Sequence, residues 1–451
     1  MASNYFQVVL NHWHPINTTS MAPNPFGNEV SNVAIMVREA VAFPLLELPN
    51  ETVAEVVKAA DFKTIAKLRL TCRHLNNIAL PILAKTPEFM TRSIMVSIVS
   101  IRAIYAIANH NCLGRHLTTL KVGVNHLVDP SKIQSWGFKG VKQTVTPFKT
   151  DVWEKQEGLS KRSIFEAMIY CVLVKCTNLK TIEISGSPPD RGQKALEHWD
   201  APFGARTIDQ AINQNVVTNF EFDCYEEENR DYARRVVYDV ILAMAKFGAK
   251  AGRTPPDLVI QIGKAASCPF NITPTALVPY ADMKLNIPNS FANLRAFLRE
   301  NPLKVQSLVL SLGFRTGVWW RNWSADLCSF ITLFANLREL TITVSSQGRS
   351  HFPGLSQGLR VPHLRKLSLS HFIADSPGLI AALLHAHRNT LEEVHLSHFK
   401  LRASNTEWIR FAVALRTVGI KKLGLSNCSG VGGKLRFRDV WNVVPGKDSW
   451  K

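Results

Sequence analysis

The candidates for catalysis or metal binding in this sequence are a pair of histidines and a glycine-rich segment. His385 and His387 are two positions apart in a predicted helix, where side chains diverge, and no carboxylate is close in sequence. Residues 430–433, Gly-Val-Gly-Gly, lack the Lys-Ser or Lys-Thr pair of a phosphate-binding loop. No His-Glu-x-x-His helix or paired-cysteine zinc motif occurs. We therefore expect no enzymatic activity, no cofactor and no metal site.

The composition is that of a folded protein with more than one cooperative unit. Of its 451 residues, 46% are hydrophobic and 20% are charged. The eight cysteines are scattered, and no apolar run approaches the roughly 20 residues of a membrane span. No secretory signal precedes the first predicted helix. We expect reduced thiols, no membrane contact, and a cytoplasmic or nuclear protein.

The net charge of +18 raises the question of nucleic-acid binding. Most of the excess lies in residues 301–451, with 20 Lys and Arg against 8 Asp and Glu. These cations are spread singly among apolar residues and never form a run of five. The pattern indicates solubility and a bias toward acidic partners, and it does not favour direct nucleic-acid binding.

An amphipathic helical segment spans residues 43–87, after an Asn-, Pro- and Ser-rich arm at 1–42 that we expect to be flexible. Apolar residues recur at helical spacing, first at Val53, Val56, Val57 and Ala60, then at Ile65, Leu68, Cys72 and Leu75. Three short helices cannot bury these stripes alone. Either a partner covers them, or the segment is a helical cap on the following domain.

The strings Leu48-Pro49-Asn50-Glu51, Val56-Val57 and Leu68-Arg69-Leu70-Thr71-Cys72-Arg73-His74-Leu75 resemble the F-box, above all the form found in many fungal proteins. Ala60 and Leu75 differ from the larger apolar residue and the Trp that are common at those positions. The F-box binds a Skp-family adaptor and, through it, a cullin scaffold in SCF ubiquitin ligases. The resemblance implies adaptor contact by Leu48 and Pro49, with the apolar face lined or supported by Val53, Val57, Leu68 and Cys72.

Downstream, the pattern Leu-x-x-Leu-x-Leu recurs with the spacing of a leucine-rich repeat. The middle residues of four copies, Leu340, Leu367, Val394 and Leu423, are separated by 27, 27 and 29 positions. The tetrapeptide Leu-Ser-His-Phe also recurs, at 369–372 and 396–399. Other copies lie at Val305/Leu308/Leu310, Leu117/Leu120/Val122, Leu179/Ile182/Ile184 and Val217/Phe220/Phe222.

These repeats predict an α/β fold, an irregular leucine-rich repeat solenoid of strand–helix units with helical insertions. We expect a linking helix at 88–111, the repeat domain at 112–435 and a terminal cap or tail at 436–451. Helices are predicted at 327–335, 377–387 and 407–415, and insertions at 123–178 and 223–257. A hydrolase hidden in these insertions would need a cleft with convergent, pKa-shifted groups, and the sequence indicates none.

Side chains alternate along a strand, so the residues between the core leucines should form one exposed, concave surface. Small hydroxyls and single charges on such a surface suit hydrogen bonding to a protein better than phosphate tracking. A loop at 314–323 with three tryptophans is another candidate contact. The predicted client-binding positions are Thr341, Thr343, Lys366, Ser368, Ser370, Glu393, His395 and Ser397.

Two functions remain open at this point. The resemblance implies a non-catalytic substrate receptor of an SCF-type ligase, with a Skp-family adaptor on the F-box and an unidentified client on the repeats. The alternative is a leucine-rich scaffold without a ligase role, whose basic C-terminal half contacts nucleic acid or another acidic partner.

Overall fold

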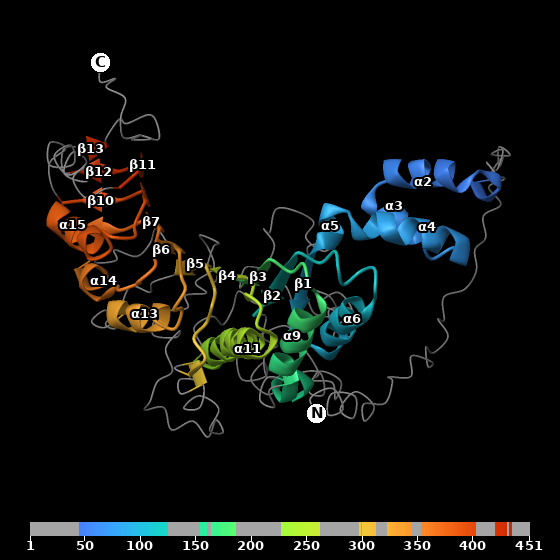
Figure 1. Cartoon of the computed structure of the whole chain (residues 1–451), viewed down its shortest axis with the longest axis horizontal. Helices are drawn as coiled ribbons and strands as arrows, with labels where there is room; N and C mark the ends of the chain where they lie inside the picture. Colours follow the sequence, from blue (N-terminus) through green and yellow to red (C-terminus); the bar gives the residue numbers. More distant parts are fainter. Residues whose placement is uncertain are drawn as a thin grey trace, which may run out of the picture. The chain divides into compact units, whose positions relative to one another are not determined.

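The computed structural model describes residues 45–124, 154–159, 164–185, 227–261, 297–298, 300–312, 323–344, 353–402, 420–430 and 433–434. The chain divides into two compact units, Met1–Thr86 and Pro87–Lys451. Among the described residues, no helix combines the length and apolar character needed to cross a membrane. Figure 1 shows the elements of both units.

The first unit is helical. It contains a short 3₁₀ turn, η1 (Leu45–Glu47), and the helices α2 (Asn50–Ala59), α3 (Phe62–Leu68) and α4 (Arg73–Ala84). Asp61 caps α3, because its carboxylate accepts hydrogen bonds from the Thr64 backbone N–H and hydroxyl, both at 2.9 Å. These two bonds, the backbone one first, lower the pKa of Asp61. Helix α4 begins at Cys72, whose Sγ accepts the Leu75 N–H at 3.5 Å.

A small apolar core holds these helices together. Helices α2 and α3 both pack against α4. Val53 and Val57 of α2 are fully buried, and Ile65 of α3 is 2% exposed. Burial of each such aliphatic side chain contributes about 1.5–3 kcal/mol. The apolar helix faces predicted from the spacing therefore pack against one another at these residues.

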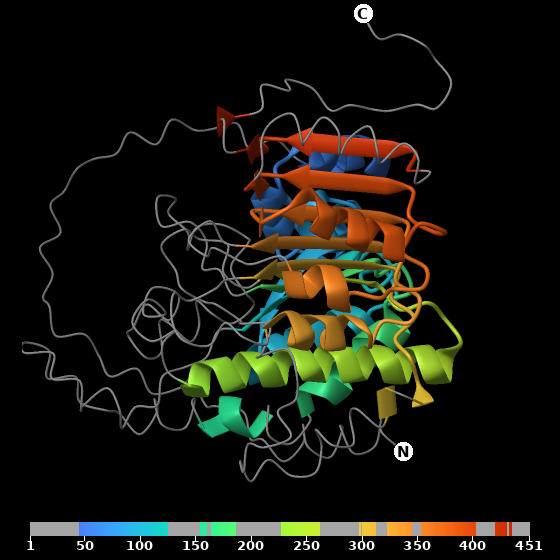
Figure 2. The same ribbon diagram turned by 90° about the vertical axis from the view of Figure 1, so that its left-hand side faces the viewer.

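The second unit is built on a sheet of nine parallel strands whose order follows the chain. All its arrows point the same way (Figure 2). The expectation of an α/β fold is thereby confirmed. The strands are β1 (Thr91–Met95), β2 (Thr119–Gly123), β3 (Thr181–Ser185), β4 (Asp257–Gln261), β5 (Ser307–Leu312), β6 (Glu339–Val344), β7 (Lys366–Ser370), β9 (Glu393–Ser397) and β11 (Lys422–Ser426).

Helices connect and cover these strands. The longer ones lie on one face of the sheet (Figures 1 and 2), and their neighbours pack as α6 with α9, α9 with α11, α13 with α14 and α14 with α15. On that face each strand buries its repeat residues, as Leu367 and Leu369 of β7 do at 0% exposure. The helices are α5 (Pro87–Met90), α6 (Ile98–Asn109), α9 (Ile164–Lys175), α11 (Glu227–Ala251), α13 (Trp323–Ile331), α14 (Pro353–Gly358) and α15 (Pro377–Ala386).

The recurring Leu-Ser-His-Phe has a structural cause. His371 and His398 adopt left-handed backbone conformations, with φ of 65° and 51°, and turn the chain out of β7 and β9. The His371 N–H donates to the Ser397 carbonyl at 3.0 Å, and Phe372 and Phe399 then enter the core. Behind these two turns, and behind a third at Asn427 (φ 51°), the chain adds β8 (Ile373–Ala374), β10 (Lys400–Leu401) and β12 (Ser429–Gly430) to a small second sheet. Its fourth strand, β13 (Gly433–Lys434), pairs antiparallel with β12.

The structure differs from the sequence expectation near the start of the sheet. Residues 88–111 were expected to form a linking helix, with the repeats beginning at 112. They contain strand β1, which pairs with β2, so the sheet begins at Thr91. Ile94 and Met95 are buried there because β1 covers the end of the core. Strand β4 had no predicted counterpart, and the copy at 217–222 lies outside the described residues.

The boundaries of α15 agree with the prediction to within one residue, whereas α13 begins and ends four residues before the predicted helix. Helix α13 overlaps the predicted 327–335, and α15 covers 377–386 of the predicted 377–387. The predicted insertions contribute α9 and α11. The predicted helix at 407–415 and the tryptophan-rich segment 314–322 lie outside the described residues.

Candidate protein-binding surfaces

The sheet brings the eight predicted client-binding residues together. They belong to three adjacent strands, β6, β7 and β9, and all are partly exposed. The register aligns Thr341, Ser368 and His395 in one row. A second row holds Thr343, Ser370 and Ser397, where the Ser397 hydroxyl donates to the Ser370 hydroxyl at 2.8 Å. Lys366 and Glu393 form a third row. One continuous polar face results.

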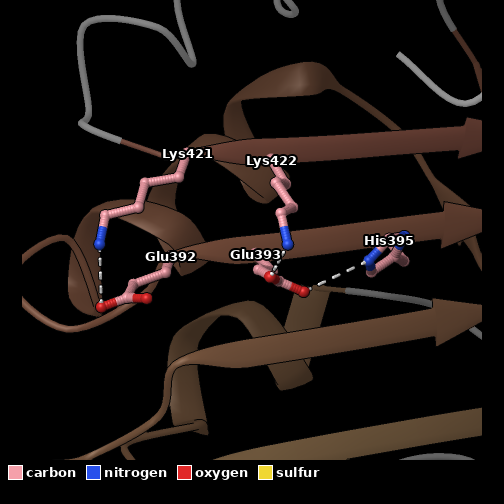
Figure 3. A network of polar contacts seen from close by, with 5 residues as sticks. All are labelled: Glu392, Glu393, His395, Lys421 and Lys422. Atoms are coloured by element: carbon pink, nitrogen blue, oxygen red, sulfur yellow. Dashed lines mark hydrogen bonds and ion pairs between the residues drawn. The ribbon is translucent and has the colours of Figure 1, made fainter. Parts of the chain in front are cut away.

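Charges at the start of β9 and β11 pair with one another (Figure 3). Lys422 Nζ lies 2.6 Å from Glu393 Oε1, and Lys421 Nζ lies 3.3 Å from Glu392 Oε1. The Lys422 hydrogen bond lowers the pKa of Glu393. Such surface pairs contribute at most about 1 kcal/mol each. Their main effect is that the two lysines add little net positive charge to this face.

His395 lies over a glycine of the neighbouring strand. Its Nε2 is 3.9 Å from Glu393 Oε2, and Figure 3 shows the ring turned toward that carboxylate. Gly424 is opposite in the register and buried, and a Cβ added there would collide with the His395 ring. Because Gly424 has no side chain, the imidazole ring of His395 fits above it.

The two helix-end histidines have separate roles. His385 is exposed, and its Nε2 lies 3.3 Å from Arg388 Nη1. His387 is 4% exposed: its Nδ1 donates to the Leu383 carbonyl at 2.9 Å, and its Nε2 accepts the Val361 N–H at 3.1 Å. Burial lowers its pKa. His387 is thus a neutral structural residue that joins the end of α15 to the segment before β7.

On the helical unit, the predicted adaptor-binding residues divide into two groups. Pro49 is exposed, and Leu48, Leu68 and Cys72 are half-buried. Val53 and Val57 are fully buried, so they can support a docking face but cannot contact a partner. Sequence reasoning left three exposed apolar side chains out of the site: Leu46 at 58%, Val56 at 44% and Leu70 at 75% exposure. Leu70 stands inside the F-box-like string, which was a usable signal.

No protein-family model matches the chain, and no curated protein matches it. The resemblance of residues 44–83 to the F-box therefore rests on the quoted residues alone.

The helices contributed by the insertions enclose a group of charged side chains. Arg235 Nη2 of α11 lies 3.2 Å from both carboxylate oxygens of Glu157, and Lys246 Nζ lies 2.9 Å from Glu166 Oε2. Asp239 lies in the same interface, and its Oδ2 is buried without a hydrogen-bond partner. Burial first, and then Glu166, raise the pKa of Asp239 well above its usual range.

These charges neutralise one another across packed helices. No group of three or more His, Cys, Asp or Glu side chains within the described part of the chain has the geometry to hold a metal ion. The arrangement fits helix–helix packing in which one carboxyl is in excess.

Proposed function

We propose that the chain is the substrate-recognition subunit of an SCF-type ubiquitin ligase. Residues 43–87 would act as an F-box that docks a Skp-family adaptor, and the second unit as a leucine-rich repeat solenoid that binds a client. The observation that carries the proposal is the F-box-like string on a separate helical unit that leaves Leu46, Val56 and Leu70 exposed. Apolar side chains exposed on so small a unit favour a partner.

The proposed mechanism is proximity. The adaptor and cullin hold the chain beside a charged conjugating enzyme, and the repeat unit holds the client there. Tethering raises the effective concentration of the client's lysines near the enzyme, so no reacting group is needed from this chain.

The exposed face of the sheet supports a protein client over nucleic acid. Hydroxyl and imidazole groups dominate its central rows, and these form directional hydrogen bonds with peptide groups. Lys422 is engaged by Glu393. Nucleic-acid binding would instead require clustered free cations with aromatic side chains for base stacking.

The test is a pull-down of the full chain with a purified Skp-family adaptor. The Leu48→Ala/Pro49→Ala variant should lose saturable binding, because it removes the exposed end of the proposed docking face. Lys63→Ala/Lys85→Ala, two exposed changes in the same unit, is the matched control and should bind like wild type.

Circular dichroism of each variant checks that the helices remain folded. Absence of adaptor binding by folded wild-type chain would refute the ligase role and leave a repeat scaffold. Equal loss in both variants would also refute the assignment of Leu48 and Pro49.

A further inference from the structure

The parallel sheet collects all helix-to-strand turns at one edge, which we call the strand-start edge. Figure 2 shows this edge at the tails of the arrows. In the nine-stranded sheet, each described turn that leads into a strand after β1 carries at least one exposed Lys or Arg. The six that define the edge here are Arg115, Lys180, Lys304, Arg338, Arg365 and Arg388.

Backbone hydrogen bonds fix the spacing of these cations. The Arg365 N–H donates to the Arg338 carbonyl at 2.7 Å, and the Glu392 N–H donates to the Arg365 carbonyl at 2.8 Å. Arg338 and Arg365 are thus direct neighbours on adjacent strands, about 4.8 Å apart along the edge. Six such steps separate β2 from β9 in the strand order, so the six cations extend over roughly 29 Å.

Several of these cations have no partner for their charge within the described part of the chain. Arg338, Arg365, Lys180 and Lys304 make no side-chain hydrogen bond or ion pair there. Arg253 and Lys421 differ, since Arg253 donates to the Thr177 carbonyl at 3.0 Å and Lys421 pairs with Glu392. The unpaired charge is therefore concentrated before β3, β5, β6 and β7.

We infer that the strand-start edge binds an acidic, extended protein segment. The ligand is inferred from charge complementarity, because each of the free Lys and Arg side chains along the edge can pair with a carboxylate of an acidic segment. An extended chain rises about 3.4 Å per residue, so roughly nine residues would span the six cations. The inference rests on the proposed function in taking this segment to belong to the client.

Two observations favour a protein segment over nucleic acid. Among the side chains whose exposure the structure describes, every Phe, Tyr and Trp is buried or half-buried, so none of them is an open platform for base stacking. Glu339 and Glu392 also lie along this edge, and a continuous phosphate chain would have to pass both. In a protein segment, neutral residues can lie opposite these carboxylates.

The test uses a fluorescein-labelled oligo-glutamate peptide, the full chain and fluorescence anisotropy, with no adaptor present. Failure of adaptor docking and failure of this inference are then separate results. Wild type should bind the peptide, more weakly as salt rises. Arg338→Glu/Arg365→Glu should bind at least about tenfold more weakly, because two attractive contacts become repulsive.

Lys400→Glu/Arg402→Glu is the matched control. It makes the same charge change at exposed positions around β10 and should stay within about twofold of wild type. Thermal melting by circular dichroism establishes that both variants are folded. Equal losses in both variants would overturn the inference, because net charge alone would then explain binding. So would unchanged binding by the Arg338/Arg365 variant, or tighter edge-dependent binding of a single-stranded oligonucleotide than of the peptide.

Discussion

Asp239→Asn should make the chain more stable at neutral pH. Asp239 lies between α9 and α11 among Glu166, Arg235 and Lys246, and its Oδ2 has no hydrogen-bond partner. Glu157 and Glu166 already engage the two bases, which leaves Asp239 as the surplus carboxyl. Burial and Glu166 raise its pKa in the folded state. Asn has nearly the same shape and carries no charge to bury.

The magnitude follows from proton linkage. Because the folded pKa is raised, the folded state holds a proton that the unfolded state releases above pH of about 3.9. Wild-type stability therefore falls as pH rises through this window, by up to about 1.4 kcal/mol per pH unit. The advantage of Asn should therefore be smallest near pH 4 and should increase as pH rises toward 6.

Urea unfolding between pH 4 and pH 7, followed by tryptophan fluorescence, measures this difference. Asp375→Asn is the control: Asp375 forms an exposed pair with Arg402 at 3.2 Å, so the change should cost less than about 1 kcal/mol. A variant at Asp239 that is less stable than wild type at pH 6 would refute the reasoning. It would mean that Asp239 is ionised and is stabilised by Arg235 and Lys246.

Three further substitutions test the packing. Gly114→Ala should destabilise the chain by about 2 kcal/mol in urea unfolding, because the new Cβ would lie 2.7 Å from the Ala108 carbonyl oxygen. Its control is Gly158→Ala, which should be neutral or stabilising because a Cβ there would have no atom within 4 Å. His387→Ala should cost about 2 kcal/mol at pH 7.5. The neutral form of His387 contributes stability above about pH 6.5. This contribution is lost as pH falls through the lowered pKa of folded His387, so His387→Ala should cost less stability at pH 5 than at pH 7.5. Gly424→Ala should displace the His395 ring and shift its NMR signals while the chain stays folded; unchanged signals would contradict the described overlap.

The strands of the C-terminal half could be predicted from sequence because their core residues follow one period. Leu340, Leu367, Val394 and Leu423 are all at most 5% exposed, and each lies in a strand aligned with its neighbours. Once the strands are known, the alternation of side chains along each strand shows which positions are exposed. The residues predicted to share the exposed face therefore lie side by side in the sheet.

In the N-terminal half, β2 and β3 carry the predicted repeat copies, whereas β1 and β4 were not predicted. Strand β1 buries Ile94 and Met95 in a five-residue segment beside a longer helical run, and the helical period dominated the interpretation. Strand β4, with Leu258 and Ile260, follows the 25-residue helix α11, so no fixed spacing marks it. Neither the excess carboxyl of Asp239 nor the row of cations at one edge has a local signature, because both depend on residues brought together by the fold.

The strand order of the sheet has a consequence for how the chain folds. Each strand of the nine pairs only with those that precede and follow it in the strand order along the sequence. Closing such neighbouring contacts costs little loop entropy, so folding can nucleate locally and propagate outward. The strands emerge from the ribosome in the order in which they pair, and a partly synthesised sheet already contains correctly paired strands. Within the nine-stranded sheet, the unpaired strand edges are then those of β1 and of the newest strand, so each added strand covers the edge left by the one before it.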